Sequence, residues 1–404
     1  MEQPRFTDYQ DQYKFPMGQL IYERVPDAEV TFRLTNRKAD TMPLATYIRP
    51  EELQERYDEL RQTLRITPQE VDVLRQQEGK HYSEDFLRYV QDMRLPEIAV
   101  SLDPTTHDLT AETSGRWNDV SLWEIPMLAT LPELYYPRRL RALGLTMSEV
   151  QREGDRRLSE TIALLRDNPQ VKFAEFGTRR RFSSEWQRHV VERLATECPE
   201  NFLGTSNPHL AAEYNVPAVG TNAHELAMVY AALEDARGGA AVDGQTQAID
   251  DWLERFPSMP VALTDTFTTD FTLSAMTPEQ YEAVQSYRID SGDERVVGRR
   301  IIQELGRRGI DPMTRTLFFS NSLTPKKAVE LADYFDGRIG VAFGIGGNLV
   351  NDLGQPGMNV VAKAVAVNGH GTVKLSDDAG KHMGSPKDIA RYQAQVRQSL
   401  TMAA

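Results

Sequence analysis

The spacing of apolar side chains changes about 165 residues into the chain. Before that point, residues 50–64 and 147–165 are rich in charged side chains and have the amphipathic pattern of surface helices. Thr67, Pro68 and Glu70 form the start signal of another helix, namely an N-cap, a proline at the first helical position and a capping-box acid. The first part of the chain is therefore predicted to be rich in helices.

From about residue 170 onward, short apolar and β-branched runs alternate with helical patterns. The runs that predict strands are residues 171–176, 201–203, 217–219, 261–263, 287–289, 316–319 and 339–343. The stretches between them that predict helices include residues 183–194, 224–235, 294–305 and 326–334. This alternation is typical of parallel strands joined by crossover helices, and so many strands in roughly 170 residues fit a barrel or a doubly wound sheet.

Every predicted strand is followed by small, polar or charged residues. The segments that follow the strands are GTR (177–179), GTSN (204–207), GTN (220–222), TD (264–265), DSGD (290–293), SN (320–321) and GIGG (344–347). A single segment of this kind could be an ordinary turn. Ligands of parallel α/β folds bind at the carboxyl ends of the strands, however, and a barrel brings those ends together. The repeated pattern predicts one concave polar site.

Composition and charge narrow the class of protein. The 404 residues are enough for two packed units or for one barrel with additions. A net charge of −13 argues against nucleic acid or an anionic membrane as the main partner. The chain has no apolar run long enough to cross a bilayer and no signal-peptide pattern at its start. The single cysteine, Cys198, cannot form an internal disulfide, which fits a reducing, cytoplasmic location.

Two segments carry charged residues suited to an anionic ligand. Three arginines, Arg179 to Arg181, follow a strand directly, and the planar guanidinium group binds phosphate or carboxylate in a bidentate manner. The segment RIDSGD (288–293) places Arg288, Asp290 and Asp293 around a tight turn, where the acids could hold ribose hydroxyls or magnesium. A solvated loop in the first case and an Asx turn in the second are the alternatives that the residues leave open.

A glycine loop and a histidine complete the candidate chemistry. Gly344, Gly346 and Gly347 follow a strand and would let backbone N–H groups approach a phosphate closely. The sequence contains no Walker A motif, so any use of ATP depends on a different phosphate cradle. His224 lies just past a strand, at the start of an apolar helix, where many histidines are only polar cap residues. Residue types and spacing alone lead to a phosphate-binding α/β barrel.

These segments resemble the nicotinate phosphoribosyltransferase family, and the similarity runs nearly from end to end. The most specific pieces are FGTRRRFS (176–183), GTSN (204–207), GTNAHE (220–225), RIDSGD (288–293) and FGIG (343–346). Further pieces are DQYK (11–14) with Met17, SLWEIP (121–126), KLSD (374–377) and GK (380–381). Phe15 and Pro16 depart from the family pattern, and so does the residue after the glycine loop, Asn348.

The resemblance implies an irregular α/β barrel beside an α+β domain that is built from both chain ends. The barrel would span residues 141–354, and the second domain would combine residues 1–140 with about 355–404. The implied reaction transfers ribose 5-phosphate from phosphoribosyl pyrophosphate (PRPP) to nicotinate, the first committed step of NAD salvage from this base. In the family, ATP phosphorylates a histidine, and hydrolysis of the phosphohistidine drives the transfer. His224 occupies the position of that histidine. Magnesium is the expected metal and a homodimer with shared sites the expected assembly.

The resemblance also assigns roles to individual residues. Phe176 is expected to stack on the pyridine ring, and Tyr13 of a neighbouring subunit to close its other face. Arg179 and Arg288 are expected to bind phosphates or the nicotinate carboxylate. The remaining assignments are Asp265 and Asp290 for organising His224, ribose and magnesium, Asp293 as a further magnesium ligand, Ser320 and Asn321 for substrate, and Gly344, Gly346 and Gly347 for the 5-phosphate.

Ser206 is the residue from which the preferred base is predicted. Relatives that use nicotinamide carry an acidic residue at this position, and an acid there would repel the carboxylate of nicotinate. A serine can donate a hydrogen bond instead, so the prediction is nicotinate. The alternatives are a phosphoribosyltransferase for nicotinamide or quinolinate, and a non-catalytic barrel that senses nucleotides. The retention of Arg179, His224, Arg288 and Asp290 argues against the non-catalytic alternative.

Overall fold

Six of the seven strands predicted in the later part of the chain lie side by side in a six-stranded parallel sheet. A computed structural model describes residues 4–77, 79 and 81–403. The strands of the parallel sheet are β4 (Phe173–Glu175), β5 (Phe202–Thr205), β6 (Val261–Leu263), β7 (Ser286–Ile289), β8 (Thr316–Phe319) and β9 (Gly340–Ile345). The side chains of β4, and most of those of β7 and β8, are buried, because helices cover the sheet. This explains why the sequence shows continuous apolar runs here.

The strand order is β5-β4-β9-β8-β7-β6, so the first strand of the region pairs with the last. A ring of consecutive parallel strands has this order. Among the described strands no pairing joins β5 to β6, so the ring is open at that place. The predicted strand at 217–219 lies beside the opening and is reduced to a single bridge between Thr205 and Ala218. The predicted mixed α/β fold class is confirmed, and the strand order is the one expected for an irregular barrel.

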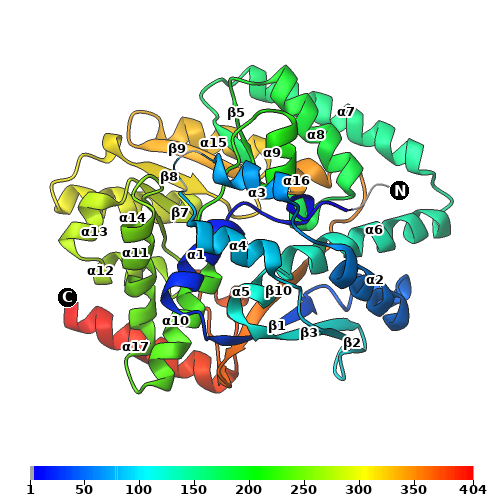
Figure 1. The fold of residues 1–404 in the computed structure, drawn as a ribbon. Coiled ribbons are helices and arrows are strands. Elements are labelled where there is room, and N and C mark those ends of the chain that lie inside the picture. Colours follow the sequence, from blue (N-terminus) through cyan, green and yellow to red (C-terminus); the bar gives the residue numbers. More distant parts are fainter. Residues whose placement is uncertain (1–3, 78, 80, 404) are drawn as a thin grey trace.

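A second, antiparallel sheet takes its strands from both ends of the chain. Its order is β11-β10-β1-β3-β2, and its strands are β1 (Glu29–Asn36), β2 (Ile98–Leu102), β3 (Leu109–Arg116), β10 (Val360–Val367) and β11 (His370–Gly371). Buried and more exposed side chains alternate along β1, as in a sheet with one covered face. Figure 1 shows β10, coloured for the C-terminal part, beside the blue β1. The apolar pattern did not predict these strands, although the family resemblance implied an α+β region here.

The helices surround the two sheets. In chain order they are α1 (Lys14–Arg24), α2 (Pro50–Thr63), α3 (Pro68–Arg75), α4 (Glu84–Asp92), α5 (Trp117–Ser121), α6 (Glu124–Ala142), α7 (Met147–Arg166), α8 (Ser184–Glu197), α9 (Pro208–Glu213), α10 (His224–Ala236), α11 (Gly244–Arg255), α12 (Thr269–Ala275), α13 (Pro278–Ala283), α14 (Glu294–Arg307), α15 (Pro325–Phe335), α16 (Gly347–Val350) and α17 (Pro386–Ala403). The predicted helices match α2, α7, α8, α10, α14 and α15 within three residues at each end. The capping box of Thr67 and Glu70 is also confirmed.

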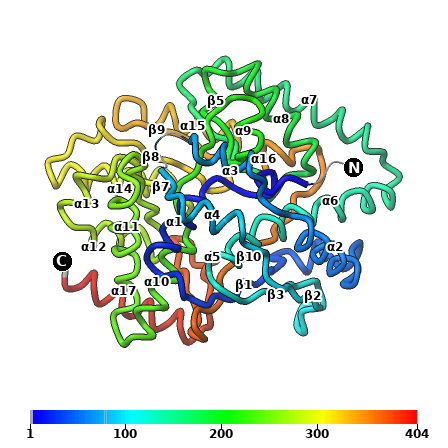
Figure 2. Tube along the Cα trace, viewed as in Figure 1, coloured from blue at the N-terminus to red at the C-terminus, as the bar shows by residue number. Residues whose placement is uncertain are grey.

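The N-terminal segment joins the two sheets. Figure 2 shows this dark blue segment crossing the middle of the molecule, and its contacts reach both sides. The backbone N–H of Gln12 donates to the carbonyl of Ser206, which follows β5 (2.6 Å), and the side-chain amide of Gln10 donates to the carbonyl of Leu122 (3.0 Å). Residues 10–20 are consequently buried. This placement brings the motif DQYK next to the carboxyl ends of the parallel strands.

The limits of the two predicted domains, at about residues 140 and 354, remain predictions, because the two sheets share a continuous buried core. None of the described helices is long and apolar enough to cross a membrane.

Candidate active site

A cavity of about 390 Å³ opens where the parallel strands end and the antiparallel sheet begins. Eleven of the fourteen predicted site residues line it. They are Tyr13, Phe176, Arg179, His224, Arg288, Asp290, Ser320, Asn321, Gly344, Gly346 and Gly347. The predicted concave site at the carboxyl ends of the strands is therefore present, and strand β10 contributes a wall that the sequence did not predict.

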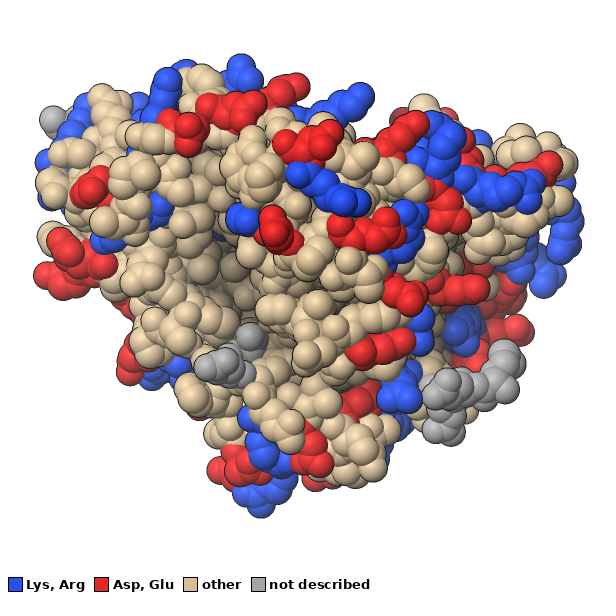
Figure 3. All heavy atoms as spheres, turned by 90° about the horizontal axis from the view of Figure 1, so that it is seen from above, with Lys and Arg blue, Asp and Glu red and all other residues tan. Residues whose placement is uncertain are grey.

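The cavity is strongly basic in a chain whose net charge is −13. The Lys and Arg side chains that line it are Arg37, Lys38, Arg179, Arg180, Arg288, Lys363, Lys374 and Lys381, whereas Glu124 and Asp290 are the lining carboxylates. On the face of the molecule seen in Figure 3, by contrast, acidic and basic side chains are interspersed and no broad basic area appears. Cations concentrated in one cavity suit a small polyanion.

His224 is the first residue of α10 and lies at the inner end of the cavity. Its Nδ1 atom is 3.0 Å from Oγ1 of Thr266, and its Nε2 atom is 2.9 Å from Nζ of Lys374 and 3.2 Å from Oδ2 of Asp290. Lys374 and Asp290 line the cavity, so Nε2 is the nitrogen on the cavity side. A neutral imidazole that donates its Nδ1 proton to Thr266 would accept the hydrogen bond from Lys374 at Nε2.

Burial and the neighbouring ammonium group of Lys374 lower the pKa of His224, although Asp265 and Asp290 act in the opposite direction. The imidazole is therefore neutral at pH 7. Burial alone would raise the pKa of Asp290, but the adjacent His224 and the charge of Arg288 lower this pKa well below its usual value. A neutral imidazole beside an ionised carboxylate is the state that a nucleophilic histidine requires.

Asp265 supports this centre from behind the cavity and does not line it. Its side chain is fully buried, and its Oδ2 atom accepts a hydrogen bond from Ser291 (2.5 Å). The same carboxylate lies 3.5 Å from Nζ of Lys374 and 3.7 Å from Nε2 of His224. Asp265 therefore balances the charge of Lys374 and acts on His224 without reaching a ligand.

Arg288 is fixed at the end of β7 by three hydrogen bonds. Its Nη1 atom donates to Oγ1 of Thr221 and to the carbonyl of Asn222, both at 2.9 Å, and Nε donates to Oγ of Ser320 (3.0 Å). Ser320 in turn donates to Oδ1 of Asp290 (2.8 Å). Arg288 is buried but lines the cavity, so its guanidinium group is held in place before any ligand binds.

The glycine loop follows β9 and packs against Phe176. A Cβ atom on Gly344 would lie 2.7 Å from the ring of Phe176, and one on Gly346 would lie 2.7 Å from the carbonyl oxygen of Phe176. Phe176 also packs against Phe318, with 5.5 Å between ring centroids. Gly344 is thus required by the ring of Phe176 and Gly346 by the backbone of Phe176, in addition to any role in binding phosphate.

The substitution Gly344→Ala is expected to displace Phe176 and to raise the KM for the pyridine base that the family resemblance implies about fivefold, since an aromatic contact contributes about 1 kcal/mol. The matched control is Gly347→Ala, whose Cβ atom would meet only Arg180, at an ordinary 3.7 Å. Steady-state kinetics on both variants test this expectation. Equal KM values for the two variants would contradict it.

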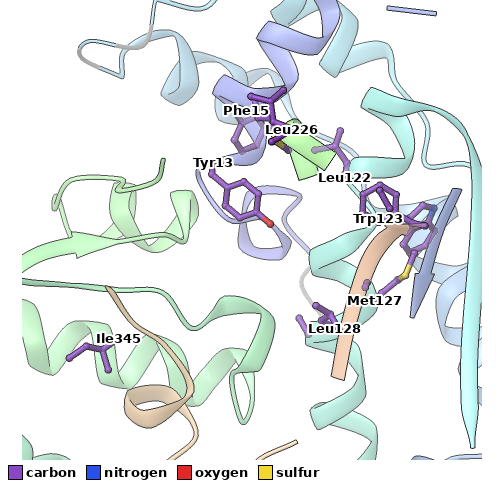
Figure 4. Packing of buried hydrophobic residues seen from close by; sticks show 14 of the residues in the cluster. Tyr13, Phe15, Leu122, Trp123, Met127, Leu128, Leu226 and Ile345 are labelled. Carbon is purple, nitrogen blue, oxygen red and sulfur yellow. The ribbon is translucent and has the colours of Figure 1, made fainter. Parts of the chain in front are cut away.

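Tyr13 of the same chain already occupies the cavity wall. Its hydroxyl group donates to Oε2 of Glu124, the first residue of α6 (2.6 Å), and Figure 4 shows this hydroxyl directed toward the helix that carries Met127 and Leu128. The guanidinium carbon of Arg179 lies 5.9 Å from the centroid of the Tyr13 ring. The prediction placed the tyrosine of a neighbouring subunit here, but one chain brings Tyr13, Phe176 and Arg179 to one cavity by itself. The expected homodimer stays a prediction.

Ser206, the residue from which the preferred base was predicted, does not line the cavity. It is 3% exposed, and its hydroxyl group donates to Oδ1 of Asp11 (2.6 Å). Burial raises the pKa of Asp11 above its usual value, and Arg179 and the hydrogen bond from Ser206 offset only part of this rise. Ser206 therefore helps to hold the carboxylate of Asp11 in place, and Asp11 in turn lies beside Arg179.

Asp293 is the third predicted residue that lies outside the cavity, after Asp265 and Ser206. It is exposed and caps α14 by accepting a hydrogen bond from the backbone N–H of Val296 (2.9 Å). Asp290 reaches the cavity, but its two oxygens already contact His224 and Ser320. Within the described residues no group of three or more His, Cys, Asp or Glu side chains could hold a metal ion. The expected binding of magnesium by Asp290 and Asp293 stays a prediction.

Sequence reasoning did not assign roles to several residues that the structure places in or next to the site. Lys374 and Thr266 contact His224, while Glu124 and Lys363 lie at the opposite end with Arg179. Lys374 and Glu124 belong to the family-like segments KLSD and SLWEIP, which was the available signal. Lys363 and Thr266 had no such signal, because Lys363 is a single polar residue in an apolar run and Thr266 is one of several threonines in its segment.

Comparisons with known proteins agree with this geometry. Residues 171–403 match the nicotinate phosphoribosyltransferase (NAPRTase) family, and residues 9–132 match the N-terminal domain of the same family. The chain is 34% identical over 394 residues to a nicotinate phosphoribosyltransferase of Cupriavidus necator, with 96% of each chain covered. It is 35% identical over 401 residues to the one of Acinetobacter baylyi, covering 96% of this chain and 95% of the relative.

The fold is likewise similar to a solved structure. A crystal structure of nicotinate phosphoribosyltransferase from Porphyromonas gingivalis superposes with a TM-score of 0.87 and 29% sequence identity, over 98% of this chain and all of that one (100%). The two family matches together span most of the chain, on both sides of the basic cavity. This chain therefore belongs to the nicotinate phosphoribosyltransferase family.

Proposed function

We propose that this protein transfers ribose 5-phosphate from PRPP to nicotinate, and that ATP drives the transfer through phosphorylation of His224. The overall products would be nicotinate mononucleotide, pyrophosphate, ADP and phosphate. The observation that carries the proposal is a neutral, buried imidazole held between Thr266, Lys374 and Asp290 at one end of a basic cavity. The relatives are nicotinate phosphoribosyltransferases, which supports the transfer of a phosphoribosyl group to nicotinate.

In the first step, Nε2 of His224 attacks the γ-phosphorus of ATP. The N–P bond forms as the P–O bond to ADP breaks, and the imidazole keeps its Nδ1 proton on the side of Thr266. The ring gains positive charge in this step, which the ionised Asp290 stabilises. Lys374 lies close enough to Nε2 to balance the charge of the phosphoryl oxygens.

In the second step, the pyridine nitrogen of nicotinate bonds to C1 of PRPP as the C–O bond to pyrophosphate breaks. The sugar develops positive charge, so catalysis depends on position and charge stabilisation more than on a strong base. Arg288 and Lys381 are available to the anionic groups of PRPP, and Phe176 and Tyr13 to the pyridine ring. Water then hydrolyses the phosphohistidine to histidine and phosphate.

The preference for an acid over an amide is supported by the cations at the Tyr13 end of the cavity. Arg179 and Lys363 both lie there, and Glu124 shares its charge between them and Lys14. Of these groups, the cations Arg179 and Lys363 and the carboxylate Glu124 line the cavity, so a nicotinate carboxylate would gain an ion pair there, whereas nicotinamide would gain none. Ser206 no longer contributes to this argument, because it does not reach the cavity.

The experiment that tests the proposal is mass spectrometry of the intact protein after incubation with ATP. The expected result is an acid-labile phosphate on a peptide that contains His224, together with the formation of nicotinate mononucleotide when nicotinate and PRPP are added. Equal turnover with nicotinamide would overturn the assigned base. A protein that makes the mononucleotide without becoming phosphorylated would overturn the role of ATP.

A further inference from the structure

Lys14 is a fully buried lysine that lies outside the cavity and contacts two carboxylates, that of Glu124, which lines the cavity, and that of Glu225, which does not. Its Nζ atom is 2.7 Å from Oε2 of Glu124 and 2.7 Å from Oε2 of Glu225, and it donates to Oγ of Ser121 (3.0 Å). Its side chain has no exposed surface (0%). An ammonium group has three protons to donate, and here each has an acceptor, so the buried charge is fully satisfied.

The first carboxylate, Glu124, holds three groups at the end of the cavity where Tyr13 and Arg179 lie and where the pyridine ring of nicotinate would bind. Oε2 accepts the hydroxyl proton of Tyr13 (2.6 Å), and Oε1 lies 3.0 Å from Nζ of Lys363 and 3.5 Å from Nη1 of Arg179. These three partners come from the N-terminal segment, from β10 and from the loop after β4. A displacement of Glu124 would therefore move all three.

The second carboxylate, Glu225, belongs to the histidine end. It follows His224 directly in the first turn of α10, and its Oε1 atom accepts a hydrogen bond from Nε1 of the buried Trp117 (2.7 Å). The side chains of Lys14 and Glu225 do not line the cavity, so they can act on a ligand only through Glu124 and His224. The chain Glu124–Lys14–Glu225 thus forms one continuous ionic bridge between the two ends.

The bridge is charged at neutral pH. Burial alone would lower the pKa of Lys14, but Glu124 and Glu225 raise this pKa above its usual value. Burial alone would raise the pKa of Glu124, yet Lys14, Lys363 and Arg179 bring it well below the usual value. None of the three side chains of the bridge can adopt another rotamer without leaving a buried charge unpaired, which makes the bridge rigid.

We propose that Lys14 is a positioning residue that couples the phosphorylation state of His224 to the binding of nicotinate at the Tyr13–Arg179 end. This inference rests on the proposed function. Phosphorylation adds negative charge beside the first turn of α10, and a shift of that turn carries Glu225, and with it Lys14 and Glu124. By linkage the coupling is reciprocal, so bound nicotinate also alters the stability of the phosphohistidine.

The test compares kcat/KM for nicotinate, at saturating PRPP, with and without ATP. The value with ATP divided by the value without ATP measures the coupling. Glu225→Gln keeps the size of the side chain but removes the charge that holds Lys14. It is expected to lower the ratio about tenfold, within the usual range of such couplings. The phosphate that ATP transfers to the protein is expected to stay within about twofold of the wild-type amount, since no group in contact with His224 is changed.

The matched control is Glu254→Gln, which removes an exposed partner of Arg24 on α1 (2.6 Å) and is expected to leave the ratio unchanged. If Glu225→Gln does not fold, Trp117→Phe decides instead. It removes the hydrogen bond to Glu225 without changing a charge, and a fall of about threefold in the ratio is expected. Circular dichroism and thermal melting establish that each variant is folded.

The outcomes separate the two proposals. A wild-type protein that gains no phosphate and no rate from ATP overturns the proposed function and this inference with it. A wild-type protein that responds to ATP, with folded variants that respond equally, overturns the inference alone. A lower ratio with undiminished phosphorylation of His224 supports the bridge, because a merely structural defect would lower both.

Discussion

The variant His224→Ala is expected to lose ATP hydrolysis by more than about 1,000-fold while it retains slow, ATP-independent formation of nicotinate mononucleotide. The imidazole is the only group at the inner end of the cavity, among the described residues, that combines a neutral nitrogen nucleophile with a carboxylate and an ammonium group within 3.2 Å. The groups that would bind nicotinate and PRPP lie elsewhere in the cavity and are unchanged. Release of phosphate from ATP and formation of the mononucleotide are measured separately.

The control for this variant is His189→Ala. Nε2 of His189 also lies near a carboxylate, 2.6 Å from Oδ1 of Asp155, but His189 does not line the cavity. Its substitution by alanine is therefore expected to leave both rates unchanged. ATP hydrolysis at the wild-type rate in His224→Ala would remove His224 from the mechanism. Loss of both activities would give the histidine a role in binding and would leave the phosphohistidine without support.

The later part of the fold could be predicted because each of its elements has a local signal. Strands such as 316–319 are buried on both faces and show as uninterrupted apolar runs, and α3 begins at a complete capping box. The location of the site followed from the polar residues at the strand ends. Eleven predicted residues line one cavity because parallel strands deliver their carboxyl ends to the same place.

The antiparallel strands were not predicted, although β1 does have a local signal. Its apolar residues Val30, Phe32 and Leu34 alternate with polar ones, which is the period-two pattern of a strand with one covered face and not the continuous apolar run by which the parallel strands were recognised. Its neighbour β10 is more than 300 residues away in the sequence and pairs with it only in the folded chain. The cavity wall that carries Lys363 depends on this pairing.

The same limitation explains why some predicted site residues lie outside the cavity. Ser206 and Asp293 follow strands, as the functional residues do, and residue type alone cannot distinguish a side chain that faces the cavity from one that bonds to Asp11 or caps a helix. Lys374 and Lys14 depend on partners 150 and 211 residues away, His224 and Glu225 respectively. Such contacts between distant segments are set by tertiary packing and leave no spacing to recognise.

The variant Arg288→Met is expected to lower kcat/KM for PRPP by about 100-fold to 1,000-fold, the cost of removing one fixed cation from a site where charge develops. Three hydrogen bonds hold the guanidinium group before substrate binds, so no ordering cost arises in the transition state. Methionine keeps most of the volume of the side chain. The expected loss therefore comes from the charge and its orientation, not from a cavity.

The pH profile separates the charge of Arg288 from its shape. Burial raises the pKa of Asp290, and Arg288 is one of the groups that lower it, so in Arg288→Met this pKa rises toward the usual value. Asp290 must be ionised to stabilise the phosphorylated imidazole, and the acid limb of the ATP-supported rate is therefore expected to move to higher pH. Arg288→Lys keeps the charge but not the planar geometry, so it should restore the acid limb while the rate stays low. A profile that does not move in Arg288→Met would show that Arg288 acts on the substrate alone and does not influence Asp290.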